Sequence, residues 1–190
     1  MASLKGQLLI ASPRLMDPNF VRTVVLMVQH GEEGALGLIL NRPLQATVRD
    51  VCEKVLETSC EIDSPLYQGG PCEGPLMVLH THGEEDEPEV LPGLHFTAER
   101  GKIEKLLAGG WESAEGGGPL GDGLYAKFFV GYAGWGAGQL ESEMETGSWL
   151  TAPAEVLHVF DPSEKLWSKL TTWLTVGIDP DRIPDDPSVN

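Results

Sequence analysis

The sequence predicts an α+β fold in a single domain. About seven short strand-like runs alternate irregularly with three helical patterns, unlike the regular strand-helix order of a doubly wound sheet. Hairpin-forming runs dominate the first half, and no repeat with a fixed period is present. A chain of 190 residues is typical of one domain with a substantial core. We therefore expect one domain over residues 1–178 and an acidic tail, rich in proline and aspartate, at 179–190.

Three apolar runs near the N-terminus predict neighbouring strands. Residues 7–11 read Gln-Leu-Leu-Ile-Ala and end before a proline, which lacks the donor that a central strand needs. Residues 23–30 and 35–40 are apolar without clean alternation, which is typical of strands buried on both faces. The four residues at 31–34 favour an antiparallel hairpin between them.

A capping pattern predicts the first helix after Thr47. Asp50 stands three residues later, as in a capping box. The apolar residues that follow recur at the spacing of one buried helical stripe: Val48, Val51, Cys52, Val55 and Leu56. Cys52 is therefore expected in the core.

The middle of the chain combines short strands with a second helix. Residues 65–71 are predicted as a short extended piece that ends in a tight turn, and strands are predicted at 75–80 and 94–96. Thr97 is placed to cap a helix. The acidic run at 84–89 contains a proline and cannot form a core of its own. We expect that run to be a solvated loop.

The last third begins with a predicted strand at 125–130. A short helix is expected at 139–145 and a last strand at 156–160. The final helix repeats Leu166, Trp167, Leu170, Trp173 and Leu174 along one stripe. This pattern is expected to bury two tryptophans on one stripe of the helix.

Charge and composition exclude several classes of protein. The formal net charge is −16, from 29 acidic and 13 basic residues, so direct nucleic acid binding is not expected. No apolar run approaches the ~18 residues that a membrane span requires. Three cysteines, an odd number without C-x-x-C spacing, and the lack of an apolar signal region favour a cytoplasmic protein with reduced thiols.

Several sequence blocks stand in a characteristic order. They are GQLLIASP at 6–13, DPNFVRTVV at 17–25, GALGLILNRP at 34–43, GGP at 69–71, VLH at 78–80, GYAGW at 131–135, GQLE at 138–141 and GSWL at 147–150. In this order the chain resembles the bacterial YqgE/AlgH family over nearly its whole length. The family usually has valine where this chain has Cys72.

The resemblance implies a fold and leaves the activity open. It implies a single α+β domain with curved, mostly antiparallel, bifurcated sheets and about three flanking helices. The family is named for a proposed transcriptional regulator of alginate synthesis, and its biochemical activity is not settled.

The stretch from Gly131 to Glu141 holds four glycines and two aromatic residues directly after a predicted strand. One interpretation is an anion-binding loop, but it lacks the known phosphate-binding spacings and three glutamates crowd the following helix. The alternative, which we favour, is close packing of Tyr132 and Trp135 against a crossing backbone. The indole Nε1 of Trp135 would then donate to an acceptor.

Catalytic and metal patterns are weak. His80 and His82 would share one face of a strand, but the neighbouring residues lack the spacing of a zinc site, so we predict no metal and no cofactor. Cys72 follows a Gly-Gly-Pro turn and could act as a nucleophile only with a nearby histidine such as His80 or His82. No G-x-S-x-G motif is present, and we predict no catalytic residue.

Polar residues in turns at the strand ends are better candidates for binding. Arg14, Asp17, Asn19, Arg22, Asn41 and Arg42 could hold a small anion or could simply tie the turns together, and the second interpretation is favoured. The full set of candidate ligand-binding residues is Arg14, Asp17, Arg22, Asn41, Arg42, Gly69, Gly70, Pro71, His80, Gly134 and Trp135.

These patterns favour a non-enzymatic regulatory or accessory protein that binds a small ligand or a protein partner. One alternative is a transcriptional regulator that acts on DNA directly or indirectly, which the negative charge opposes. Another is a hydrolase-type enzyme that uses His80 or Cys72. The sequence identifies neither the partner nor the oligomeric state.

Overall fold

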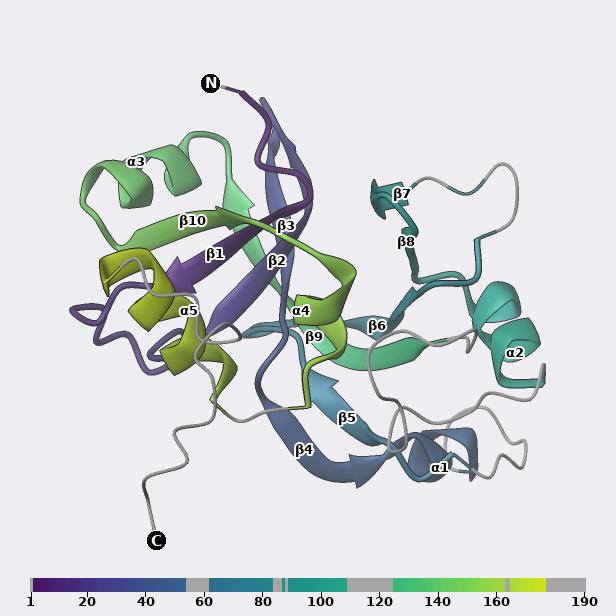
Figure 1. The fold of residues 1–190 in the computed structure, drawn as a ribbon. Helices are drawn as coiled ribbons and strands as arrows, with labels where there is room; N and C mark the ends of the chain where they lie inside the picture. Colours follow the sequence, from purple (N-terminus) through teal and green to yellow (C-terminus); the bar gives the residue numbers. More distant parts are fainter. Residues whose placement is uncertain are drawn as a thin grey trace, which may run out of the picture.

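The chain winds ten strands into one curled sheet flanked by helices (Figure 1). The computed structural model describes residues 2–53, 62–83, 87, 89–108, 125–162 and 165–176, so the expected tail at 179–190 lies outside the described residues. The strands are β1 (Gln7–Ala11), β2 (Val24–Gly31), β3 (Gly34–Ile39), β4 (Pro43–Thr47), β5 (Pro65–Gln68), β6 (Cys72–His80), β7 (Glu89–Leu91), β8 (Leu94–Thr97), β9 (Ala126–Gly136) and β10 (Trp149–Pro153). The helices in the described part are α1 (Val48–Val51), α2 (Arg100–Ala108), α3 (Gln139–Glu145), α4 (Val156–Phe160) and α5 (Leu166–Val176).

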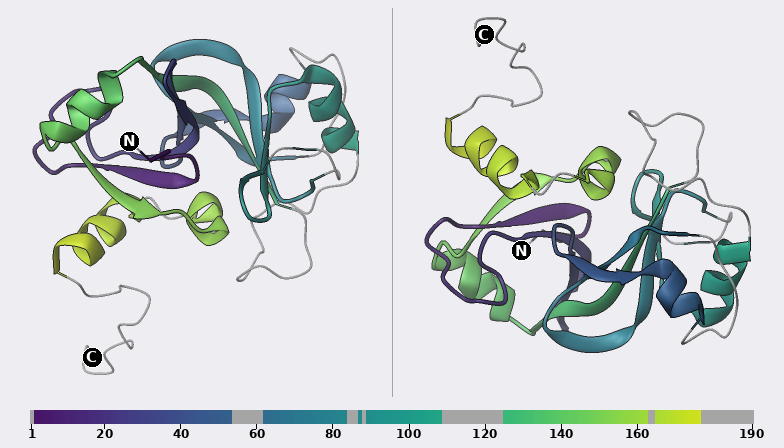
Figure 2. Two further views of the ribbon diagram at one scale, coloured as in Figure 1. Left: turned by 90° about the horizontal axis from the view of Figure 1, so that it is seen from above. Right: turned by 90° about the horizontal axis from the view of Figure 1, so that it is seen from below.

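The sheet forks along β9, its longest strand. The strand order is β10-β1-β2-β3-β9-β6-β8-β7, with β4 and β5 off this path. The first half of β9 pairs in parallel with β5 at Phe129 and Val130, and the second half pairs antiparallel with β3 from Ala133 to Gly136. Figure 2 shows two branches of the sheet, one with β10, β1, β2 and β3 and the other with β6, β8 and β7, turning away from each other. An α+β fold with a curved, mostly antiparallel, bifurcated sheet is thereby confirmed.

Close contact between two backbones defines the fork. Gly69 donates its N–H to the carbonyl of Val130 in β9 and accepts from Ile39 N in β3. A Cβ atom at Gly69 would lie 2.2 Å from the carbonyl oxygen of Gly131, whose φ is +71°. The glycine-rich stretch thus continues β9 instead of forming a loop, and it packs against a crossing backbone.

Strands β1 and β2 are buried on both faces, as the sequence predicted for β2. Leu8 and Ile10 belong to a core that reaches β6, α4 and α5, whereas Leu9 and Ala11 face a second core with α3. A third core lies under α1 and α2. The predicted hairpin is present as β2 and β3, paired antiparallel.

The helices predicted after Thr47, after Thr97 and over 166–174 formed where expected, as α1, α2 and α5. Thr47 caps α1 through a capping box with Asp50, and α5 buries Leu166 and Leu170. The short helix expected at 139–145 is α3. Val55 and Leu56 of the first predicted stripe lie outside the described residues.

The last strand predicted, at 156–160, is wrong because these residues form α4. The side chain of Glu155 accepts from the backbone of His158, whose Nδ1 accepts from Glu155 N at 3.1 Å. This reciprocal cap starts a helical turn after Pro153 ends β10. A local capping contact outweighs the strand propensity of the valines.

The cysteines depart in part from the expectation of reduced thiols. Cys52 is fully buried, as predicted, and takes part in a disulfide bond. Cys72 is a free, half-buried thiol. Spacing outside C-x-x-C carries no information about pairing, so the sequence could not indicate this bond. Among the described helices, none is long and apolar enough to cross a membrane.

Candidate functional site

The predicted cluster of turn residues is satisfied by its own main chain. Asp17 Oδ1 accepts from Asn19 N at 2.7 Å. Asn41 Oδ1 accepts from Val24 N, and Asn41 Nδ2 donates to the carbonyl of Arg22, both at 2.9 Å. These bonds tie the 17–22 turn to the end of β3.

The arginines of this cluster also make structural contacts. Arg42 Nη2 donates to the carbonyl of Pro18 at 3.1 Å. The guanidinium of Arg22 lies 5.7 Å from the ring centre of Trp167 in α5. Arg14 is exposed, and the contact described for it is its backbone N–H to Ser12 Oγ. The contacts of this cluster therefore fit the interpretation in which these residues tie the turns together.

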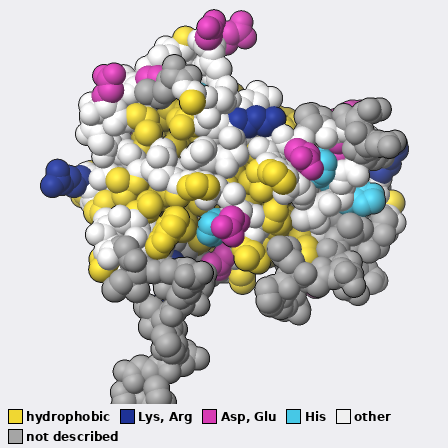
Figure 3. Space-filling view, turned by 45° about the horizontal axis from the view of Figure 1, so that its top comes forward, with side chains coloured by type: hydrophobic (Ala, Val, Ile, Leu, Met, Phe, Trp, Pro, Cys, Tyr) yellow, Lys and Arg dark blue, Asp and Glu magenta, His cyan; other side chains and the backbone are white. Residues whose placement is uncertain are grey.

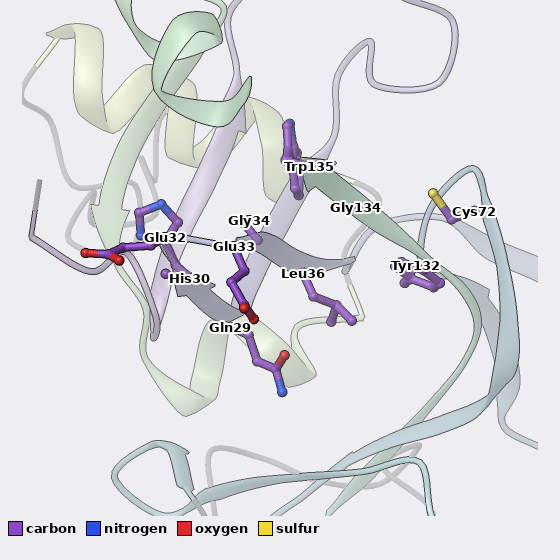
Figure 4. Close-up of a pocket in the computed structure, with 12 residues that line it drawn as sticks. Gln29, His30, Glu32, Glu33, Gly34, Leu36, Cys72, Tyr132, Gly134 and Trp135 are labelled. Atoms are coloured by element: carbon purple, nitrogen blue, oxygen red, sulfur yellow. The ribbon is translucent and has the colours of Figure 1, made fainter. Parts of the chain in front are cut away.

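An open hollow of about 690 Å³ lies where the β2–β3 hairpin meets the second half of β9 (Figure 4). Its walls are Gln29, His30, Gly31, Glu32, Glu33, Gly34, Ala35, Leu36, Cys72, Tyr132, Gly134 and Trp135. Of the predicted binding residues, only Gly134 and Trp135 line it. The hairpin residues were missed because a pairing across about 100 residues of sequence brings them to β9.

Tyr132 and Leu36 give the hollow an apolar wall. A Cβ atom at either Gly74 or Gly134 would lie 3.0 Å from the ring of Tyr132, so these two glycines leave room for the ring over the sheet. Cys72 is the cross-strand partner of Tyr132. The free thiol is therefore held beside the aromatic ring.

The rim of the hollow is anionic. Glu32 and Glu33 are exposed at the hairpin turn. His30 Nδ1 accepts from Leu4 N at 3.0 Å, so the ring proton sits on Nε2, which donates to Glu141 Oε1 at 3.0 Å. Hydrogen bonds to its own backbone N–H and to His30 lower the pKa of Glu141. A cationic group suits this rim better than an anion does.

Trp135 contributes mainly to packing. It is only 5% exposed and stacks on Phe20 at 5.9 Å. Its Nε1 donates to Glu143 Oε2 at 3.0 Å, and the same oxygen accepts from Trp149 Nε1 at 2.8 Å. The predicted acceptor for Trp135 is therefore supplied by α3.

Gly70 and Pro71 line a second hollow of about 580 Å³, which shares Cys72 with the first. Gly69 is buried in the fork. The three residues of the predicted Gly-Gly-Pro turn thus have different places: Gly69 packs in the fork, and Gly70 and Pro71 line the second hollow.

Cys72 and His80, the two residues of the hydrolase alternative, are far apart. Cys72 and His80 stand at opposite ends of β6. Eight residue steps along a strand span roughly 25 Å. His80 therefore cannot activate the thiol of Cys72.

His80 lies instead in a buried polar cluster. It is 0% exposed, pairs across the strands with His95, and their rings stack at 5.7 Å. His80 Nε2 lies 3.6 Å from Glu87 Oε1, and the Glu87 side chain is only 4% exposed, so the expectation of a solvated acidic loop is wrong at this residue. Burial lowers the pKa of His80, and the charge of Glu87 partly offsets this.

Lys127 is a buried cation that sequence reasoning did not single out. Its Nζ donates to the carbonyl of Val159 at 3.0 Å and lies 3.9 Å from the ring centre of Tyr67. Burial lowers the pKa of Lys127 to about 7, with the charge of Asp161 acting in the opposite direction. A lysine inside the apolar run at 125–130 was the available signal.

Fold and site together define a class: a single-domain α+β protein whose sheet forks along one long strand, with an open hollow beside the fork. The chain belongs to the AlgH-like family, whose model matches residues 8–180. The resemblance seen in the sequence blocks is thereby confirmed.

Relatives and solved structures agree with this assignment. The chain is 44% identical over 168 residues to a UPF0301 protein from Chlorobaculum tepidum, covering 86% of this chain and 83% of that protein. It is 38% identical over 189 residues to a UPF0301 protein from Xanthomonas campestris pv. campestris, covering 96% and 94%. The solution structure of the AlgH protein from Pseudomonas aeruginosa is similar with a TM-score of 0.69 and 34% identity, covering 93% of this chain and 90% of that one.

A crystal structure of protein DIP2367 from Corynebacterium diphtheriae shares the fold. Its TM-score is 0.68 at 23% identity, and the match covers 90% of this chain and 87% of that one.

Proposed function

We propose that this protein is a non-enzymatic regulatory or accessory protein that binds a small ligand, or one side chain of a protein partner, in the hollow beside β9. The observation that carries the proposal is the combination of an open volume of about 690 Å³, an apolar wall and an anionic rim. Ligand sites in proteins commonly have volumes of ~300–1,000 Å³.

The wall and the rim indicate the chemistry of the ligand. Leu36 and Tyr132 can cover an apolar body, and an aromatic ring also attracts a cation. Glu32 and Glu33 add negative charge at the hairpin turn. The favoured ligand has an apolar part and a positively charged group, such as an ammonium or guanidinium.

Direct action on DNA is opposed by charge. The net charge is −16, and on the face shown in Figure 3 the Lys and Arg side chains stand apart from one another. Binding to phosphates needs clustered basic residues. A partner protein is the better route for any effect on transcription.

The binding proposal can be tested with matched probes. N-acyl lysine and arginine amides are compared with carboxylates of the same size, by ¹H–¹⁵N chemical-shift mapping on the full chain. The cationic probes are expected to move the signals of Leu36, Tyr132 and Gly134. Shifts confined to other regions would contradict the proposal.

Variants localise the site. Tyr132→Leu and Glu33→Gln are expected to weaken binding of the cationic probe by about 2- to 5-fold each. An exposed cation–π contact contributes ~0.5–1 kcal/mol, and an exposed ion pair contributes up to about 1 kcal/mol. Glu99→Gln, at an exposed acid near α2 outside the hollow, serves as the control. Equal affinity in all three variants would rule out the hollow.

We also propose a cytoplasmic location. The free thiol of Cys72 supports it, because thiols persist in reducing compartments. The disulfide at Cys52 points the other way. Cell fractionation combined with thiol trapping tests whether the protein lies in the cytoplasm or in an oxidising compartment.

A further inference from the structure

Two imidazoles stack in the interior between β6 and β8, away from the hollow beside β9. His80 and His95 are partners across these strands, and their ring centres are 5.7 Å apart. His80 Nδ1, His80 Nε2 and His95 Nδ1 are buried without a hydrogen-bond partner among the described residues. Buried polar atoms almost always have such partners. Packing therefore holds this pair of rings, and burial favours the neutral form of an imidazole over the charged form.

The main chain at Gly83 fixes the stack. A Cβ atom at Gly83 would lie 2.0 Å from His95 Nε2, so the backbone closes over that ring. The His95 ring therefore cannot turn away from His80 while this part of the chain stays in place. Two imidazoles held this close repel each other when both are charged. The pair thus takes up a proton in the closed structure only at a cost in free energy.

The buried carboxylate near the pair is shared with a lysine. Glu87 Oε1 lies 3.6 Å from His80 Nε2, and the same oxygen lies 3.5 Å from Lys102 Nζ in α2. Glu89 Oε1 in β7 lies 3.9 Å from His95 Nε2, but the Glu89 side chain is 51% exposed. An exposed carboxylate contributes little to an ion pair. The negative charge beside the rings therefore offsets only part of the cost of a buried imidazolium.

The other described neighbours on β6 and β9 add no negative charge. His82 is exposed, and its charge when protonated opposes a proton on His80. In β9, Lys127 is paired with Leu79. Successive residues of a strand face opposite sides of the sheet, so Lys127 lies away from His80. Burial is the main cause of the lowered pKa of His80, and the charge of Glu87 acts in the opposite direction.

Strands β7 and β8 form one end of the sheet and touch the branch that contains β1. β7 has three residues, and among the described strands it pairs with β8 alone. A Cβ atom at Gly6, directly before β1, would lie 2.9 Å from the carbonyl oxygen of Val90 in β7. Val90 is also buried in one core with Leu8. A movement of the β7–β8 hairpin would therefore open the contact between the two branches of the sheet.

We propose that the His80–His95 pair is an acid-sensitive latch on the β7–β8 hairpin. At neutral pH both rings are uncharged, stacked and closed off from water. When the pH falls, the pair takes up a proton, the charged ring moves into water, and the hairpin loosens from β6 and from the start of β1.

The direction of the pH dependence follows from His80. Its pKa in the closed structure lies below the ordinary value of 6.5. An open form with a solvated ring therefore binds the proton more tightly than the closed form does. The closed form has its full stability above pH 6.5 and loses stability as the pH falls from there toward the lowered pKa.

Amide hydrogen exchange of the full chain tests the latch. Exchange is measured at pH 7.5, 6.5 and 5.5 and corrected for the intrinsic exchange rate at each pH. Between pH 6.5 and 5.5 the opening constant of β7 and β8 is expected to rise by up to ~10-fold, because one proton taken up on opening gives at most tenfold per pH unit. Amides of β1 and β2 should keep their protection. Constant protection of β7 and β8, or an equal loss in both branches, would overturn the proposal.

Variants separate the latch from a general sensitivity to acid. His80→Gln is expected to reduce the rise in the opening constant to about 2-fold or less, since the titrating ring is gone. His82→Gln, at an exposed histidine two residues along, is the matched control and should keep the wild-type rise. A wild-type rise in His80→Gln would contradict the latch.

Glu87→Gln tests the latch even if His80→Gln does not fold. The charge of Glu87 favours the protonated His80 ring in the closed form. Its removal is therefore expected to enlarge the rise in the opening constant of β7 and β8 at acid pH, whereas a carboxylate with a purely structural role would change protection equally at every pH. An unchanged or smaller rise in Glu87→Gln would overturn the proposal.

Discussion

The two branches of the sheet differ in whether their buried polar side chains have hydrogen-bond partners. In the branch formed by β10, β1, β2 and β3, the polar side chains have partners: Asn41 bridges two backbone groups, and Glu143 accepts from two indoles. In the branch formed by β6, β8 and β7, His80 and His95 are buried with unpartnered nitrogens. Lys127, on the half of β9 that pairs with β6, is buried with a lowered pKa. We therefore expect the stability of the first branch to be insensitive to pH and that of the second branch to depend on pH.

The largest effect is expected at the fork that joins the branches. Gly69→Ala places a Cβ atom 2.2 Å from the carbonyl oxygen of Gly131, and backbone cannot yield cheaply there. We expect a loss of about 4 kcal/mol or more in the free energy of unfolding, or failure to fold. Urea denaturation measures it.

Gly101→Ala in α2 is the control for that change. Nothing lies within 4 Å of a Cβ atom built at Gly101. The helix should gain up to about 1 kcal/mol. Similar changes in the free energy of unfolding for Gly69→Ala and Gly101→Ala would show that close backbone packing at the fork is not needed to join the two branches.

Lys127 tests the pH response of the second branch. Its pKa is about 7 in the folded protein, against 10.5 for a lysine in water. Between these two pKa values the unfolded chain binds more protons than the folded protein does. The free energy of unfolding should therefore rise with pH by up to about 1.4 kcal/mol per pH unit from this group, and it should be lowest below pH 7. Lys127→Met should flatten this dependence and stabilise the protein near pH 7.

The measurement is urea denaturation of both proteins from pH 6 to 9.5. Lys105→Met, at a residue on the exposed side of α2, serves as the control and should leave the slope unchanged. The same slope in wild type and Lys127→Met would mean that the second branch has no such pH response.

Glu143 tests the first branch. Its Oε2 accepts from Trp135 and Trp149, so Glu143→Ala leaves two indole N–H groups without their acceptor. We expect a loss of about 2–3 kcal/mol, measured by thermal and urea unfolding. Glu145→Ala, at an exposed acid two residues along α3, should cost little. Equal losses would show that the indoles find other acceptors.

The smallest effect is expected at Asn41. Asn41→Ala removes the bonds to Val24 N and to the Arg22 carbonyl, at a cost of about 1–2 kcal/mol. That loss should be constant from pH 6 to 9.5, unlike the effect of Lys127. If the loss of unfolding free energy in Asn41→Ala varied over this pH range, the first branch would also depend on pH, and the contrast between the branches would be wrong.

Local patterns allowed much of the fold to be predicted. The runs at 7–11 and 48–51 match β1 and α1, because an apolar run ended by a proline and a capping box are local signals. The strand predicted at 156–160 failed because one capping box outweighed residue propensity. The glycine stretch was interpreted correctly as a packing element, yet nothing local shows that Gly131 meets Gly69.

The candidate sites were much less predictable. The turn cluster around Asn41 was found as a cluster, but its hydrogen bonds close on the main chain. Leu36 and Tyr132 meet only through the pairing of β3 with β9, and the 3.6 Å approach of Glu87 to His80 has no sequence signal of its own. Contacts between residues far apart in sequence leave no pattern in either segment alone.

The long-range pairing of β9 also constrains how the chain is made. Gly34 pairs with Gly136, so β3 has no partner on that edge until about 100 further residues have been synthesised. An unpaired edge is a template for association with other chains. During translation the β2–β3 hairpin therefore keeps an open edge until β9 has emerged from the ribosome and paired with it.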